Sequence, residues 1–175
     1  ARWSKQYIDS ETETIASMNN LIDWLPKNLP TEKKTGIVHG DYSLSNVMVG
    51  KNDPGVIAIL DWELSTLGDP CADFNYHCLQ YTMNPKLADK AYCQEKGIPV
   101  IDEYVNLYSE QINIDLTEEW DLYTAYNLFK LAGILQGILG RVRDGTAANE
   151  NAADRAAGVK NLSDTAWDLV KKNFL

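Results

Sequence analysis

Two stretches decide the fold of this chain: His39-Gly40-Asp41-Tyr42-Ser43-Leu44-Ser45-Asn46-Val47-Met48-Val49 and Ile59-Leu60-Asp61-Trp62-Glu63. Each one sets polar side chains at the end of a short apolar run. Asp41 and Asn46 are five positions apart, and Asp61 follows fifteen positions after Asn46, beyond a turn. The pattern predicts two carboxylates and a carboxamide that meet at the ends of neighbouring strands.

That set of side chains matches the needs of phosphoryl transfer. The reaction uses one carboxylate beside the attacking hydroxyl, and an Asn and a second Asp that hold Mg²⁺ against nucleotide phosphates. We assign Asp41 as the base, because it would accept a hydrogen bond from the substrate hydroxyl. Asn46 and Asp61 are the predicted metal ligands, since Mg²⁺ prefers oxygen donors. Each of the three has an alternative as a turn residue, but their combination favours the metal site.

Four neighbouring side chains receive other roles. His39 is predicted to be buried and hydrogen-bonded, so that it holds the loop in shape rather than acting as a base. Glu63 either reaches the metal through water or forms a salt bridge within the loop. Asp73 is predicted to be structural, because a carboxylate in the first turn of a helix is stabilised there. Trp62 is predicted to lie in the core.

Three more polar residues lie outside this motif. His77 is expected to pack in the middle of a helix. Arg141 and Arg143 come near the end of the long helix predicted over 117–143. They could face an acidic group of a substrate, but basic residues are favoured at helix C-termini in any case, so the structural interpretation is preferred.

The remaining pattern predicts a mainly helical α+β domain. Strands are expected at 36–39, 46–49 and 56–60, and the turn residues at 51–55 make the last two a hairpin. Ser10 with Glu13 resembles a capping box for a helix that ends at Pro26. Capping residues and helix-breaking residues predict the later helices. The first begins at Asp69-Pro70, the second begins at Asn84-Pro85 and ends at Gly97, and the others cover 101–112, 117–143 and 147–172. We expect a single domain over 1–175.

Bulk composition excludes several classes of protein. The chain has 175 residues, of which 45% are hydrophobic, so a folded core is expected. A net charge of −9 argues against nucleic acid as a partner, and no apolar run is long enough to span a membrane. Cys71, Cys78 and Cys93 lack metal-ligand spacing and predict buried free thiols in a reducing cytoplasm.

The two opening stretches resemble the aminoglycoside phosphotransferase and choline kinase superfamily, which has a protein-kinase-like fold. Leu60-Asp61-Trp62-Glu63-Leu64-Ser65-Thr66-Leu67-Gly68-Asp69-Pro70 is similar to one branch, the phosphotransferase domain associated with acyl-CoA dehydrogenases. The resemblance implies the helical C-terminal lobe of that fold, with a small hairpin that carries the catalytic loop. It implies ATP as the donor, Mg²⁺ as the cofactor, Asp41 as the base, Asn46 and Asp61 as ligands, and a hydroxyl as the acceptor. A hydroxyacyl thioester or another hydroxylated metabolite is the implied substrate.

One part of a kinase has no counterpart in this sequence. A glycine-rich loop over the phosphates and a strand Lys paired with a helix Glu are expected upstream of the catalytic loop. The 40 residues before Asp41 predict a helix and a loop instead. We therefore expect the C-terminal lobe of a larger kinase, separated by proteolysis or by the choice of the expressed segment. Such a lobe should be inactive alone, and its uncovered surface would favour homo-oligomers.

Two alternatives belong to other classes. A non-catalytic binding or scaffold module could retain the kinase-like fold, but it has no chemical need for Asp41, Asn46 and Asp61 together. A metal-dependent hydrolase could use the same carboxylates, but the sequence offers no His ligands or obvious nucleophile for it.

Overall fold

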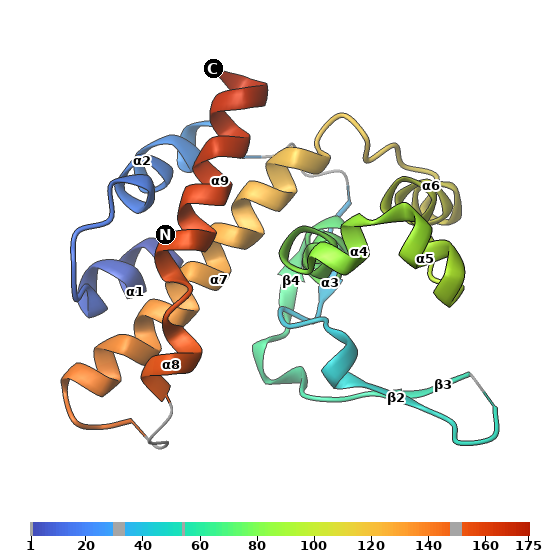
Figure 1. The fold of residues 1–175 in the computed structure, drawn as a ribbon, viewed down its shortest axis with the longest axis horizontal. Coiled ribbons are helices and arrows are strands. Elements are labelled where there is room, and N and C mark those ends of the chain that lie inside the picture. The colour runs from blue at the N-terminus through green and yellow to red at the C-terminus, as the bar shows by residue number, and fades with distance from the viewer. Residues whose placement is uncertain (1, 30–33, 54, 148–151) are drawn as a thin grey trace. The chain divides into compact units, whose positions relative to one another are not determined.

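The computed structural model describes residues 2–29, 34–53, 55–147 and 152–175. Helices dominate these ranges, and two small antiparallel sheets of two strands each complete them (Figure 1). The predicted α+β, mainly helical class is therefore confirmed. The chain divides into two compact units, one formed by Ala1–Pro30 with Thr124–Leu175 and the other by Thr31–Tyr123.

The unit that spans Thr31–Tyr123 carries both sheets. Strand β2 (Val47–Val49) pairs with β3 (Val56–Ile59) as the predicted hairpin, and Val47 lies opposite Ile59. Strand β1 (Gly36–Val38) pairs with β4 (Thr66–Gly68), which sequence patterning missed. Asn46 belongs to a 3₁₀ turn (Leu44–Asn46) rather than to β2. Both sheets end beside the polar motif.

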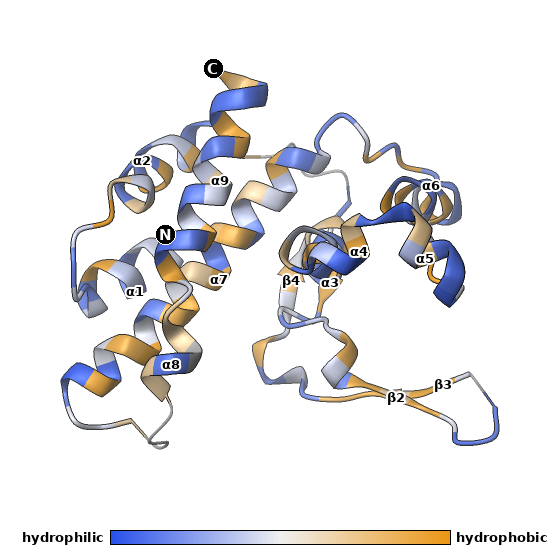
Figure 2. Ribbon diagram, in the orientation of Figure 1, coloured by the Kyte–Doolittle hydropathy of each residue, from blue (hydrophilic) through white to orange (hydrophobic). Residues whose placement is uncertain are grey.

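The hairpin is apolar and exposed. Figure 2 shows β2 and β3 in hydrophobic colours, and the exposed fractions of Val49, Val56 and Ile57 are 59%, 61% and 65%. A short β-hairpin gains little stability from its own contacts. Its side chains therefore form an exposed apolar surface.

Capping residues set the helix starts in this unit as predicted. Asp69 accepts a hydrogen bond of 2.9 Å from the backbone N–H of Cys71, and Asn84 accepts one of 3.1 Å from Lys86. One expectation is corrected: Asp89 caps a further helix, so the segment closed by Gly97 is two helices. The helices are α3 (Pro70–Met83), α4 (Pro85–Ala88), α5 (Lys90–Lys96) and α6 (Ile101–Ile112).

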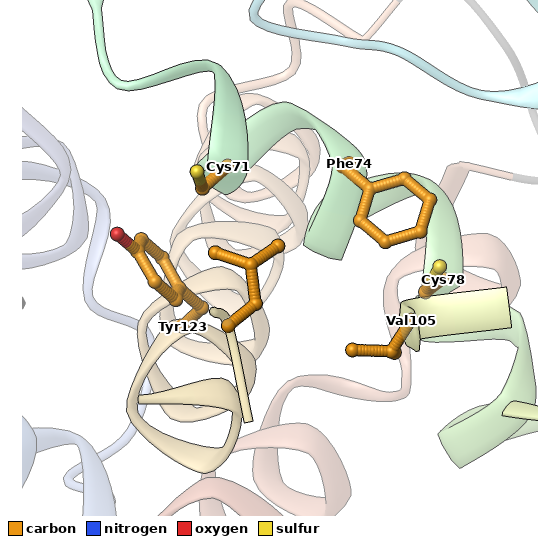
Figure 3. Packing of buried hydrophobic residues seen from close by; sticks show 6 residues of the cluster. Cys71, Phe74, Cys78, Val105 and Tyr123 are labelled. Atoms are coloured by element: carbon orange, nitrogen blue, oxygen red, sulfur yellow. The ribbon is translucent and has the colours of Figure 1, made fainter. Parts of the chain in front are cut away.

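The core of this unit joins α3 to α6 and to the start of α7 (Trp120–Arg143). Figure 3 shows Cys71, Phe74 and Cys78 of α3 packed with Val105 and Tyr123. Phe74 also stacks on Tyr108, with ring centroids 3.8 Å apart. The three cysteines are free and buried, as predicted. Burial raises the pKa of the Cys78 thiol to about 12, which keeps it protonated.

The described residues of the other unit form helices and the loops between them. Apart from α7, its α-helices are α1 (Arg2–Ser10), α2 (Ala16–Trp24), α8 (Ala152–Ala156) and α9 (Val159–Phe174). Helix α2 packs along α9 (Figure 1), and Ser17 of α2 donates a hydrogen bond of 2.9 Å to Ser163 of α9. Helix α1 packs on α7 over glycines, where Gln6 donates to the carbonyl of Gly133 at 3.1 Å.

Three boundary predictions were wrong in this part of the sequence. The expected capping box is absent, because Ser10 instead ends α1 and donates a hydrogen bond of 2.6 Å to the carbonyl of Gln6. The long helix begins at Trp120 rather than at Thr117. The segment expected as one helix over 147–172 contains α8 and α9, and residues 148–151 lie outside the described ranges. Among the described residues, no helix has the length and apolar character needed to cross a bilayer.

Candidate active site

His39 joins the two motif stretches. The residue follows β1, and its side chain is only 3% exposed. Its Nδ1 accepts a hydrogen bond of 3.2 Å from the backbone N–H of Asp41, so the ring proton is on Nε2. Nε2 then donates to the carbonyl of Leu60 at 2.7 Å. One buried, neutral ring thus fixes the segment before Asp41 against the segment before Asp61.

Asp73 holds the same loop from the side of α3. Its carboxylate accepts hydrogen bonds from the backbone N–H groups of His39 and Gly40, the latter at 3.0 Å. Gly40 has a φ of +84°, and a Cβ atom there would lie 2.5 Å from the carbonyl oxygen of Leu64. Only glycine fits this turn. These contacts agree with the structural role predicted for Asp73.

Asp41 and Asn46 are in direct contact. The Nδ2 atom of Asn46 donates to the backbone carbonyl of Asp41 at 2.9 Å and to its Oδ2 at 3.2 Å. Both side chains are partly buried. Because the amide nitrogen is turned toward Asp41, the Oδ1 oxygen of Asn46 is the atom left to bind a cation.

Asp61 is the second residue after β3, at the end of the hairpin. The carbonyl of Asn46 accepts a hydrogen bond of 2.8 Å from the N–H of Leu60, which extends the β2–β3 register by one pair. Asp61 follows with φ 66° and ψ 54°, the left-handed conformation that few residues adopt outside glycine and Asn or Asp. Its side chain is exposed and does not cap the 3₁₀ turn (Trp62–Leu64) that it precedes. The carboxylate is therefore available to a ligand.

Tyr76 is a site residue that sequence patterning missed. Its hydroxyl, which comes from α3, is hydrogen-bonded to the side chain of Asp41. Burial raises the pKa of Tyr76, and the charge of Asp41 and this hydrogen bond raise it further, so the hydroxyl stays protonated. Tyr76 comes three residues after Asp73, and residues with this spacing share one helix face. That spacing is the signal that could have found it.

The two residues that follow Asp61, Trp62 and Glu63, are both exposed. Trp62 was predicted to be core, but its side chain is 46% exposed. Its Nε1 donates to the carbonyl of Ile59 at 2.8 Å, and its ring lies 4.8 Å from that of His39. The prediction failed because Trp62 packs on the loop itself. Glu63 is exposed and makes no hydrogen bond or salt bridge with another described residue.

Tyr42 connects the loop to a small aromatic cluster formed by His77 of α3 and Tyr104 of α6. Its ring centroid lies 5.2 Å from that of His77, and the Nε2 atom of His77 is 3.2 Å from the hydroxyl of Tyr104. Burial lowers the pKa of His77, so the ring is neutral and packed as predicted. This cluster supports the loop from the side next to Asp41.

Negative charge dominates this region. Between Gly36 and Tyr76 the sequence has six acidic residues and one Lys. No group of three or more His, Cys, Asp or Glu side chains that could hold a metal occurs in the described ranges. The oxygens of Asn46 and Asp61 are the candidate cation ligands at this hairpin end, and they form a small donor set.

Comparison with known proteins is consistent with this geometry. A model of the phosphotransferase enzyme family matches residues 1–123. Mouse acyl-CoA dehydrogenase family member 10 is 37% identical over 97% of this chain, and human acyl-CoA dehydrogenase family member 11 is 34% identical over 98% of it. An Arabidopsis thaliana protein, probable acyl-CoA dehydrogenase IBR3, is also 34% identical over 98% of the chain.

A solved structure shares the fold as well. It is the crystal structure of a Ralstonia eutropha JMP134 protein provisionally named an aminoglycoside phosphotransferase. The TM-score is 0.91 and the identity is 42% over 99% of this chain and 54% of that one. The chain spans only 16% of the length of the mouse relative and 23% of the human and Arabidopsis ones.

Proposed function

Because this chain belongs to the phosphotransferase enzyme family, we propose that it carries the catalytic loop of an ATP- and Mg²⁺-dependent kinase that phosphorylates a hydroxyl group of a small molecule. The observation that supports this most directly is the hydrogen-bonded pair of Asp41 and Asn46 beside the hairpin end that precedes Asp61. If these residues only formed turns, the three polar side chains of Asp41, Asn46 and Asp61 would not all be needed.

The donor set at the hairpin end suits Mg²⁺. This ion commonly takes one or two protein oxygens and fills its remaining positions with phosphate oxygens and water. Asn46 Oδ1 and the Asp61 carboxylate would be the direct ligands, and Glu63 would reach the ion through water. When bound, Mg²⁺ would neutralise the charge of the phosphates, which the acidic surroundings would otherwise repel.

Asp41 acts on the acceptor in this proposal. Its carboxylate would accept a hydrogen bond from the attacking hydroxyl and orient that oxygen in line with the γ-phosphorus. As the new O–P bond forms, the bond from the γ-phosphorus to the bridging oxygen breaks, ADP leaves and the hydroxyl proton passes to Asp41. Tyr76 and Asn46 position this carboxylate through their hydrogen bonds, so fewer orientations have to be frozen at the moment of reaction.

The names of the sequence relatives support a choice of acceptor class. The mouse, human and Arabidopsis relatives are named as acyl-CoA dehydrogenases, whereas the solved Ralstonia structure is named as an aminoglycoside phosphotransferase. We therefore favour a hydroxyacyl thioester, or another hydroxylated metabolite, over an aminoglycoside. Because the chain spans 54% of the solved phosphotransferase, the activity is proposed for the full-length protein that contains it. The isolated chain, as the helical lobe, is expected to bind nucleotide weakly and not to turn over.

The test is a kinase assay on the full-length protein against a panel of hydroxylated acceptors, with ATP consumption as the readout. The panel should include hydroxyacyl thioesters, free hydroxy acids and aminoglycosides. Asp41→Asn should lower the rate by about 10²–10⁴-fold, which is the usual contribution of a positioned base. Asp23→Asn is the matched control, because Asp23 is exposed on α2 and the charge change is the same.

The outcomes separate the alternatives. Acceptor-dependent ATP consumption that requires Mg²⁺ and falls only in Asp41→Asn would support the kinase. Equal rates in the Asp41 and Asp23 variants would overturn the role of Asp41. The non-catalytic module would be favoured if the protein consumes no ATP with any acceptor and if Asp41→Asn binds a protein partner as tightly as wild type does. Measurable turnover by the isolated chain would refute its expected inactivity.

A further inference from the structure

A hollow of about 480 Å³ lies between α1 and the C-terminal part of α7, within one compact unit of the fold. Its charged lining consists of Arg2, Lys5 and Asp9 of α1 with Arg141, Arg143 and Asp144 at the end of α7. The sequence has only four arginines, and three of them line this hollow in a chain whose net charge is −9. Arginine is therefore far more frequent in the lining of this hollow than in the chain as a whole.

The walls of the hollow are held together by close contacts of α7 with α1 and with the residue that follows α1. Gly137 and Gly140 of α7 lie under α1 so closely that added Cβ atoms would come within 2.6 Å of Gln6 and Ser10. The guanidinium of Arg143 donates to the backbone carbonyl of Glu11 at 2.8 Å. Because glycine removes side chains at the contact, the two helices approach and leave an open, charged space beside them.

The charges in the hollow are only partly compensated. Lys5 pairs with Asp9 at 2.5 Å, and Arg143 pairs with Asp144 at 2.8 Å. Arg2 and Arg141 have no carboxylate partner among the described residues, and the guanidinium of Arg2 lies over the ring of Trp3 at 4.9 Å. The lining therefore has a net charge of +2. The preference of helix ends for basic residues accounts for Arg141 and Arg143 but not for the cations of α1.

We propose that this hollow binds the phosphate groups of a small molecule, with a diphosphate as the best match. A guanidinium presents two parallel N–H donors, which fit phosphate oxygens better than an ammonium does. The volume lies within the roughly 300–1,000 Å³ of small-molecule sites and exceeds the needs of one inorganic phosphate. A lining with a net charge of +2 favours a multiply charged anion such as a diphosphate. This site is independent of the function proposed for Asp41.

The experiment measures binding of inorganic pyrophosphate to the intact chain by isothermal titration calorimetry at low ionic strength. Arg141→Gln and Arg2→Gln each remove one uncompensated charge and should weaken binding by up to about fivefold, as expected for an exposed charged contact. Lys172→Gln is the matched control, because it makes the same charge change on α9, outside the hollow. Circular dichroism should confirm that all variants stay folded.

The outcomes are decisive in both directions. Saturable pyrophosphate binding that is weakened by Arg141→Gln and Arg2→Gln, but not by Lys172→Gln, supports the site. Equal weakening in all three variants would show that only net charge matters and would overturn it. If succinate binds as tightly as pyrophosphate does, the site has no preference for phosphate groups and the proposal is overturned. Binding to anionic lipid vesicles without binding to free pyrophosphate would identify a membrane surface instead and would overturn the small-molecule proposal.

Discussion

His39 and Leu60 are 21 positions apart in the sequence and are joined by a hydrogen bond of 2.7 Å from the imidazole Nε2 to the backbone carbonyl. The same ring accepts a hydrogen bond from the N–H of Asp41. The chain thus uses one buried side chain to set the spacing between its two motif stretches. Replacement of this imidazole ring should therefore lower the stability of the whole loop.

The first prediction concerns this ring. His39→Ala should lower the free energy of unfolding by about 2–4 kcal/mol, because it leaves the N–H of Asp41 and the C=O of Leu60 without this partner and opens a cavity at a buried position. His39→Gln should be closer to wild type, since its Nε2 can still donate to Leu60. Urea unfolding of the chain measures both values. Equal losses in the two variants would contradict the role of the Nε2 hydrogen bond.

The second prediction concerns the left-handed backbone of Asp61. Asp61→Gly should be more stable than Asp61→Ala by about 1 kcal/mol, because glycine adopts a φ of 66° without the clash that a Cβ atom creates. Both variants lose the carboxylate, so both should abolish Mg²⁺-dependent phosphoryl transfer in the full-length protein. Thermal and urea unfolding test the stability order. A more stable Ala variant would show that this conformation is not held in solution.

The third prediction compares two glycines on the face of α7 that meets α1. A Cβ atom at Gly140 would lie 2.6 Å from the Cβ of Ser10, whereas one at Gly133 would be in ordinary contact at 3.5 Å from Trp3. Gly140→Ala should therefore destabilise the chain by about 1–3 kcal/mol through overpacking. Gly133→Ala should gain up to about 1 kcal/mol, because alanine favours the helix. Equal effects on the urea midpoint would refute the close packing of α1 on α7.

The fourth prediction concerns Cys78 and alkaline pH. Burial raises the pKa of this thiol from 9.0 to about 12 in the folded chain. Between these values the unfolded state binds fewer protons than the folded state, so stability is complete below pH 9 and falls as the pH rises toward 12. The group contributes a slope of up to about 1.4 kcal/mol per pH unit.

Cys78→Ala removes this slope while leaving the tyrosines in place. The variant should lose a nearly constant amount of stability below pH 9, because the small cavity does not titrate. Its free energy of unfolding should then fall less steeply than that of wild type in urea titrations at pH 8, 9, 10 and 11. Parallel curves for the two proteins would show that Cys78 keeps an ordinary pKa.

Local signals predicted the parts of the fold that depend on neighbours in the sequence. The hairpin of β2 and β3 followed from the turn chemistry at 51–55 and the apolar runs on either side. Asp69 and Asn84 were predicted as caps because an N-cap bond closes within two or three residues. The family resemblance was also carried by contiguous motifs, which the comparisons confirmed.

Contacts between distant segments were harder to predict. Strand β4 is three residues long and is formed because β1 offers a pairing edge, so its own pattern is too short to recognise. Trp62 is hydrophobic enough to suggest a core position, yet it covers His39 on the surface of the loop. Tyr76 was missed because its hydroxyl meets Asp41 only after α3 has folded against the loop.

Asp73 and Tyr76 make the first turns of α3 a rigid spacer. One residue holds the backbone just before Asp41, and the other holds its carboxylate. An α-helix rotates by about 100° per residue, so inserting or deleting a single residue between them would swing one contact away from the loop. The exposed surface of α3 is open to change by evolution or design, but the length of this spacer is constrained by the two contacts that it makes with the loop.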